Sequence, residues 1–144
     1  MTADHDPHGL ERFASAQDAG DTYGHAVAEL RRGRKTSHWM WFVFPQIEGL
    51  GHSAMAQRYA IASLDEARAF LRHPVLGARL RECVTIVNAL PPASAEDIFG
   101  GIDAQKLRSS LTLFMRAAPD EPAFARALDR YFGGMPDDAT DQRL

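Results

Sequence analysis

The sequence predicts an all-α fold, a compact single domain of about eight short helices. Three features support this prediction: apolar residues recur at helical spacing, capping residues precede them, and glycine or proline follows them. With 144 residues, 45% of them hydrophobic, the chain can bury a core without disulfides. The expected connections of about 2–6 residues are typical of packed helices.

The first two predicted helices occupy the N-terminal part of the chain. One begins at the Asp6-Pro7 cap, with proline at the first helical position, and runs to about Gln17. The next covers about residues 22–32 and ends at Gly33, because glycine readily adopts the left-handed conformation of a helix end. Its expected inward stripe consists of Tyr23, Val27 and Leu30.

Four aromatic residues, including both tryptophans of the chain, crowd the run that follows. They are Trp39, Trp41, Phe42 and Phe44. Ser37 suits the N-cap of a short helix over residues 38–44 that Pro45 ends. The alternative is a short extended segment, because aromatic residues and valine also favour strands. We expect a helix because the surrounding segments are helical.

The remaining sequence predicts a further series of helices with clear start and stop signals. Cys83 lies in the middle of the longest one and should be a buried structural thiol. Residues 1–6 and 136–144 are expected to be flexible tails around a single domain at residues 7–135. The predicted helices cover about residues 54–60, 64–72, 75–90, 95–99, 104–117 and 120–132. Their predicted caps include Ser53, Ser63, Ser94 and Asp103.

Charge and hydropathy narrow the possible partners. The net charge of −3 argues against general nucleic-acid binding. The acidic start of the chain lacks the apolar core of a signal peptide, and no apolar run approaches the roughly 18 residues of a membrane span. We therefore expect a cytoplasmic protein that binds no membrane, carries no cofactor or metal, and exists as a monomer or homodimer.

The first candidate site lies just before the aromatic run. If Ser37 caps a helix, His38 sits in its first turn beside free backbone N–H groups, which favour the neutral imidazole. A neutral histidine can accept a proton, so we predict His38 and Lys35 as catalytic residues. Arg34, Lys35 and Ser37 would hold an anion at the same helix end. The alternative is a solvated basic turn with His38 packed beside an indole.

Other predicted ligand-binding residues lie further along the chain. Trp39 or Trp41 would stack on a ring, and Gln46 would contact a polar edge of the ligand. The turn at residues 49–53 would complete the anion site through the Gly51 backbone and Ser53, although it lacks the lysine of a P-loop. Lys106 and Ser109 share part of a helix face and would line the pocket.

Each of these signals has a structural alternative. The aromatic run could be the buried centre of the helical domain rather than a stacking wall. The glycines could serve only a tight turn, and the small serine side chains could simply let two helices approach.

Several blocks of sequence resemble an uncharacterised, mostly bacterial family known as domain of unknown function 1810. The blocks occur in one order over nearly the whole chain, and the resemblance implies a mainly α-helical fold without indicating a reaction. Some members are labelled calpastatin, but calpastatin is a disordered repeated inhibitor, whereas this sequence predicts a globular domain. The matching blocks are residues 35–46, 49–59, 63–67, 73–77, 97–100, 106–110 and 131–134.

Two functional hypotheses follow. The first is a small-ligand domain that could be an enzyme acting on an anionic, nucleotide-like substrate. The alternative is a non-catalytic module for protein interaction or homodimerisation, which would use the aromatic region from Trp39 to Phe44. A pocket with charged walls would favour the first, and a flat apolar patch would favour the second.

Overall fold

A computed structural model describes residues 6–144 and confirms the all-α prediction. Over these residues, the β pairing consists of one isolated parallel bridge between Ile47 and Ile61. None of the described helices is long and apolar enough to cross a membrane. The helices are α1 (Glu11–Asp18), α2 (Thr22–Arg31), α3 (Met40–Val43), α4 (Ala54–Arg58), α5 (Leu64–Arg72), α6 (Leu76–Ala89), α7 (Ala95–Phe99), α8 (Gly101–Ala117), α9 (Pro122–Phe132) and α10 (Asp138–Asp141), with a 3-10 turn η1 (Ala19–Asp21).

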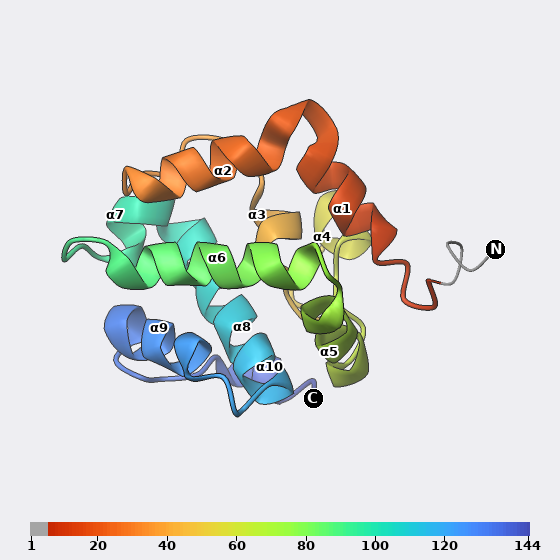
Figure 1. Cartoon of the computed structure of the whole chain (residues 1–144). Helices are drawn as coiled ribbons and strands as arrows, with labels where there is room; N and C mark the ends of the chain where they lie inside the picture. The colour runs from red at the N-terminus through yellow and green to blue at the C-terminus, as the bar shows by residue number, and fades with distance from the viewer. Residues whose placement is uncertain (1–5) are drawn as a thin grey trace.

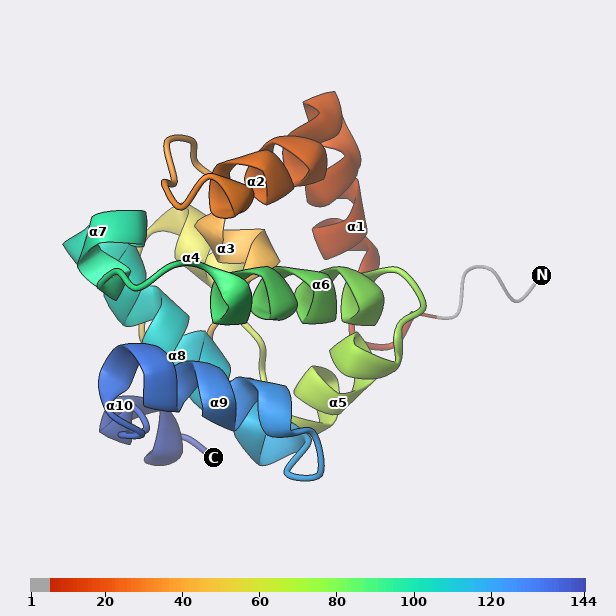
Figure 2. The same ribbon diagram turned by 60° about the vertical axis from the view of Figure 1, so that its left-hand side comes forward.

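The long helices α6 and α8 organise the domain. In both ribbon views α6 crosses the middle of the molecule, with α2 on one side and α9 on the other (Figure 1, Figure 2). Helix α8 packs against α5, α7, α9 and α10. The short helix α3, which carries the aromatic run, packs against α1.

Aromatic rings form a continuous path through the core. The Phe13 ring lies 5.2 Å from that of Phe70, which lies 5.3 Å from Phe114, which lies 6.0 Å from Phe124. Tyr59 extends the path beyond Phe13, at 5.8 Å between ring centroids. Rings from five different parts of the chain thus interlock α1, α5, α8 and α9.

Several predicted helix ends are confirmed by their hydrogen bonds. Ser53, Ser63 and Ser94 each accept the backbone N–H of the residue three positions later, as N-caps do. Gly33 follows α2 with a φ of 75°, which confirms it as the end of that helix. Cys83 is fully buried in α6 as predicted, and burial raises the pKa of its thiol to about 12.

Two predicted helix starts differ from the structure. Helix α8 begins at Gly101 with Gly100 as its N-cap residue, so Asp103 lies inside the first turn and caps nothing. Helix α1 begins at Glu11, although the Asp6 carboxylate does accept the backbone N–H groups of Leu10 and Glu11. The rest of the predicted N-terminal tail, residues 1–5, lies outside the described residues.

The C-terminal segment packs on the domain, so the expectation of a tail outside it fails for residues 137–141. Asp137 and Thr140 are buried, and α10 contacts α8. The Asp137 carboxylate accepts the hydroxyls of Ser109 and Thr140, while its backbone N–H donates to Thr112 at 2.9 Å. A network of buried polar groups therefore fixes this segment, and it escapes prediction because the segment carries few apolar residues.

Candidate functional site

Glu29 of α2 organises the segment that precedes α3. Its carboxylate accepts the backbone N–H groups of Thr36 at 2.7 Å and Ser37 at 2.9 Å, the Ser37 hydroxyl, and the Trp39 indole N–H at 3.0 Å. The Ser37 side chain is thus engaged by Glu29 and does not cap a helix, so this prediction is wrong. Helix α3 begins three residues later, at Met40.

Glu29 is buried and ionised, and sequence reasoning missed it. Burial alone would raise the pKa of Glu29, but the hydrogen bonds from Ser37, Thr36 and Trp39 outweigh burial and lower that pKa to about 2. The expected inward stripe of α2 included Leu30 but omitted Ala26 and Glu29, which are buried on the same face. An acid flanked at helical spacing by apolar residues is the signal that could have revealed it.

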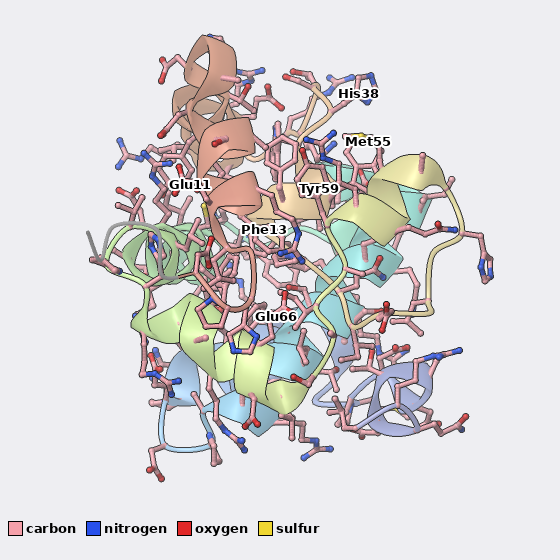
Figure 3. All side chains as sticks on the ribbon, turned by 90° about the vertical axis from the view of Figure 1, so that its right-hand side faces the viewer. Glu11, Phe13, His38, Met55, Tyr59 and Glu66 are labelled. Carbon is pink, nitrogen blue, oxygen red and sulfur yellow. The ribbon has the colours of Figure 1, made fainter. Side chains whose placement is uncertain are left out.

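The prediction that His38 sits in the first turn of a helix is also wrong. His38 precedes α3, and its side chain is exposed (Figure 3). Arg34 is exposed as well, and its backbone N–H donates to the Glu29 carbonyl at 3.0 Å. Both side chains are accessible to a ligand, but the helix end that was to activate His38 lies elsewhere. A catalytic role for His38 stays a prediction.

Lys35, in contrast, is held on every side. Its Nζ lies 2.8 Å from Asp103 Oδ2, donates to the Ser37 carbonyl, and lies 4.9 Å from the centroid of the Trp39 ring. Only 6% of the Lys35 side chain is exposed. The backbone N–H of Lys35 donates to the Ile98 carbonyl at 2.8 Å, which ties this segment to α7.

Lys106 occupies the other side of the same carboxylate. Its Nζ lies 3.8 Å from Asp103 Oδ1 and 5.0 Å from the centroid of the Trp41 ring. Trp41 is half-buried, and 22% of the Lys106 side chain is exposed. Both contacts are therefore looser and more open than those of Lys35.

The structure thus unites residues that are distant in sequence. Lys35, Asp103 and Lys106, with Trp39 and Trp41, form a group that we call the lysine cluster. Asp103 supplies the carboxylate that the predicted site lacked. It also lines an open depression of about 330 Å³ at the junction of α7 and α8, where residues 99–102 form the rest of the wall.

The other predicted ligand-binding residues are mostly engaged elsewhere. Ser53 caps α4, and a Cβ added to Gly51 would lie 2.5 Å from that of Ala56, so this turn serves a close approach to α4. Gln46 is half-buried, and its carbonyl accepts the Ile61 N–H at 2.8 Å. No described hydrogen bond or ion pair joins these residues to the lysine cluster.

The two serines after Lys106 differ in their contacts. Ser109 is buried and donates to the Gln105 carbonyl or the Asp137 carboxylate, both at 3.1 Å, so it serves the C-terminal segment. The Ser110 hydroxyl is buried without a hydrogen-bond partner among the described residues. Ser110 follows Lys106 by four positions and therefore lies on the same face of α8.

The aromatic run does not form the exposed patch that an interaction module would need. Trp39, Phe42 and Phe44 are buried, and their neighbours Met40 and Val43 are buried as well. Within residues 39–44, Trp41 is the one residue that is only half-buried. The expectation of an aromatic docking surface over residues 39–44 is therefore corrected: most of this segment is core.

Fold and site together define a small all-α domain with a half-buried lysine–carboxylate cluster beside an accessible indole. Among residues 6–144, no group of three or more His, Cys, Asp or Glu side chains is arranged to hold a metal ion. The chain belongs to the family described as "Protein of unknown function (DUF1810)", whose model matches residues 7–144.

A solved structure and the curated proteins give two further comparisons. The chain is similar to the conserved hypothetical protein Rv1873 from Mycobacterium tuberculosis, known from a crystal structure, with 50% sequence identity and a TM-score of 0.94. That match covers 96% of this chain and 98% of the other. No curated protein matches the sequence.

Proposed function

We propose that this protein binds a small anionic molecule that carries a planar ring, such as a nucleotide, at the open side of the lysine cluster. The observation that carries the proposal is the convergence of both lysines and both tryptophans of the chain around Asp103. This group combines a ring-stacking surface, positive charge and a carboxylate, which together suit such a ligand.

Trp41 provides the surface for the ring. It is half-buried, and its indole N–H donates to no protein acceptor among the described hydrogen bonds, whereas that of Trp39 is bonded to Glu29. An indole presents a large rigid surface on which a nucleobase stacks with about 1–3 kcal/mol. Trp39 is fully buried and has no face left for a ligand.

Positive charge near Trp41 favours an anion. The cluster contains two positive charges, on Lys35 and Lys106, and one negative charge, on Asp103. Lys35 forms the shorter ion pair with Asp103, at 2.8 Å against 3.8 Å for Lys106. The Lys106 ammonium is therefore the more weakly engaged cation and the one able to turn toward a phosphate. Arg34, exposed just before Lys35, adds another positive charge on the same segment.

The carboxylate gives the site hydrogen-bond acceptors. Asp103 is partly exposed at the depression beside α7, with 22% of its side chain accessible. Its oxygens can accept hydrogen bonds from hydroxyl or amino groups of a bound ligand, which adds polar recognition to the ring surface and the positive charge.

A thermal-shift titration with AMP, NAD and ADP-ribose tests this proposal. A ligand at about 100 times its Kd stabilises the folded protein by about 2.7 kcal/mol, which shifts the Tm by several degrees. We expect Lys106→Met to remove the shift. As a matched control, Arg126→Met removes one positive charge from the exposed surface of α9 and should keep the shift.

Two results would overturn the proposal. If none of the three ligands shifts the Tm of the wild-type protein, the nucleotide-like ligand class is wrong. If Lys106→Met and Arg126→Met both keep the full shift, the ligand binds elsewhere.

A further inference from the structure

The chain uses lysine sparingly, and both lysines meet at one carboxylate. Of its 16 basic side chains of the Lys and Arg types, only Lys35 and Lys106 are lysines. Arginine and lysine carry the same charge, but only the lysine amine readily loses a proton and becomes a nucleophile. Because arginine supplies the other basic side chains of these two types, we compare at each lysine position what an ammonium and a guanidinium would do.

The surroundings of Lys35 favour an ammonium. Its Nζ is enclosed by the Asp103 carboxylate, the Ser37 carbonyl and the Trp39 ring, and the side chain is 6% exposed. A compact ammonium fits this enclosure and directs its N–H groups in different directions, whereas a planar guanidinium is larger and directs its donors within one plane. Packing therefore explains why position 35 carries lysine rather than arginine.

The surroundings of Lys106 do not explain why this position carries lysine rather than arginine. Its only described polar contact is the 3.8 Å approach to Asp103, and its Nζ lies over the Trp41 ring at 5.0 Å. An arginine would form the same ion pair with bidentate geometry and would stack on an indole at least as well. Neither charge nor packing requires lysine here, so the amine itself is the remaining difference.

We infer that Lys106 is a nucleophilic amine that forms an imine with an aldehyde or ketone group of the ligand. This inference deepens the proposed function, rests on the same site, and narrows the ligand to an anionic, ring-bearing carbonyl compound. A nucleotide that ends in a reducing sugar, such as ADP-ribose, belongs to this class.

The step balances with the lysine amine, the carbonyl group and water. The Lys106 ammonium loses one proton to bulk water, and the freed nitrogen attacks the carbonyl carbon. A proton moves from that nitrogen to the former carbonyl oxygen to give a carbinolamine. A proton from bulk water then reaches the hydroxyl group, which leaves as water, and a protonated C=N bond remains. The products are the imine and one water molecule, without an oxidant or reductant.

Reductive trapping of the full chain tests the inference. The protein is incubated with pyridoxal 5′-phosphate or with ADP-ribose in the presence of cyanoborohydride, digested, and mapped by mass spectrometry. We expect the Lys106 adduct to exceed the adducts of Lys35 and of the N-terminal amine by about tenfold. NAD, a related nucleotide without a free aldehyde, should leave no adduct.

Lys106→Arg separates amine chemistry from charge. Its guanidinium keeps the positive charge at the site but cannot form an imine, so we expect it to lose the adduct. Equal labelling of Lys106, Lys35 and the N-terminal amine would overturn the inference, because it would indicate unselective surface chemistry.

The inference and the proposed function can fail separately. A Tm shift with ADP-ribose but no adduct on Lys106 would overturn the inference and leave the proposed function standing. A selective Lys106 adduct with pyridoxal phosphate, without a Tm shift from any nucleotide, would support the reactive amine and overturn the nucleotide-like ligand.

Discussion

The two lysine–tryptophan pairs of this protein contain the same residue types and share one carboxylate, yet they differ in nearly every physical respect. Lys35 and Trp39 are enclosed, and their polar groups are bonded to Asp103, Ser37 and Glu29. Lys106 and Trp41 are half-buried. Among residues 6–144, Lys106 has one long ion-pair contact, and the indole N–H of Trp41 donates to no acceptor.

This difference shows that burial and hydrogen bonding distinguish side chains that hold the structure from side chains that can contact a ligand, even within one cluster. A fully bonded, buried group cannot meet a ligand without breaking its own contacts, which costs free energy. A loosely held group loses little when it turns toward one. We therefore call Lys35–Trp39 the closed pair and Lys106–Trp41 the open pair.

Truncating the two tryptophans should give the largest contrast. Trp39→Ala should cost about 3–5 kcal/mol of unfolding free energy because it removes a fully buried ring, a large share of the roughly 5–15 kcal/mol that stabilises such a domain. Trp41→Ala should cost about 1 kcal/mol or less. Urea melts measure both, and Trp39→Phe provides a milder variant if Trp39→Ala fails to fold. Equal losses would contradict the distinction between the pairs.

Ionisation of Glu29 should make the closed pair sensitive to acid. The pKa of Glu29 is about 2 in the folded protein against an ordinary value of 4.5, so its contribution is fully present above about pH 4.5. That contribution is lost as the pH falls toward 2. It amounts to about 3 kcal/mol, because one pKa unit corresponds to roughly 1.4 kcal/mol.

The corresponding measurement compares wild type with Glu29→Gln. We expect wild type to be the more stable at about pH 6, and the difference to shrink by about pH 3. Glu96→Gln, at an exposed glutamate of α7, should change stability by about 0.5 kcal/mol or less. A Glu29→Gln difference that does not change with pH would show that Glu29 acts only as a neutral acceptor.

Replacing each lysine should also lower the unfolding free energy more in the closed pair than in the open pair, by a smaller difference than the tryptophan variants give. Lys35→Met leaves Asp103 with one distant cation and an empty donor position at the Ser37 carbonyl, so we expect a loss of about 2 kcal/mol. Lys106→Met breaks only a partly exposed pair and should cost about 0.5 kcal/mol or less. Thermal and urea unfolding of both variants check this order. A larger loss for Lys106→Met would place Lys106 among the structural residues.

Local signals predicted much of the fold. The caps at Ser53, Ser63 and Ser94 and the stop at Gly33 depend on short-range hydrogen bonds and backbone conformation, and the structure confirms them. Asp103 looked like another cap, but Gly100, with a φ of 80°, occupies that position. The Asp103 carboxylate is used instead by two lysines, one of them far away in sequence.

The candidate site was only partly predictable, because contacts between residues distant in sequence bring it together. Lys35, Trp41 and Lys106 were recognisable by residue type, but their meeting at Asp103 depends on how the segment of residues 35–41 lies against α8. Ser37 was misassigned because its hydroxyl has two possible partners, and the stronger one, the Glu29 carboxylate, comes from another helix. Tertiary contacts of this kind leave little trace in local sequence.

Quenching of tryptophan fluorescence tests the contrast between the pairs most directly, because the chain has only two tryptophans. Trp41→Phe leaves Trp39 as the sole emitter, and Trp39→Phe leaves Trp41. We predict that acrylamide quenches Trp41 several-fold more strongly than Trp39, and that a ligand found in the thermal-shift titration protects Trp41 alone. Equal quenching of the two tryptophans, or ligand protection of neither, would contradict the assignment of Lys106 and Trp41 as the open pair.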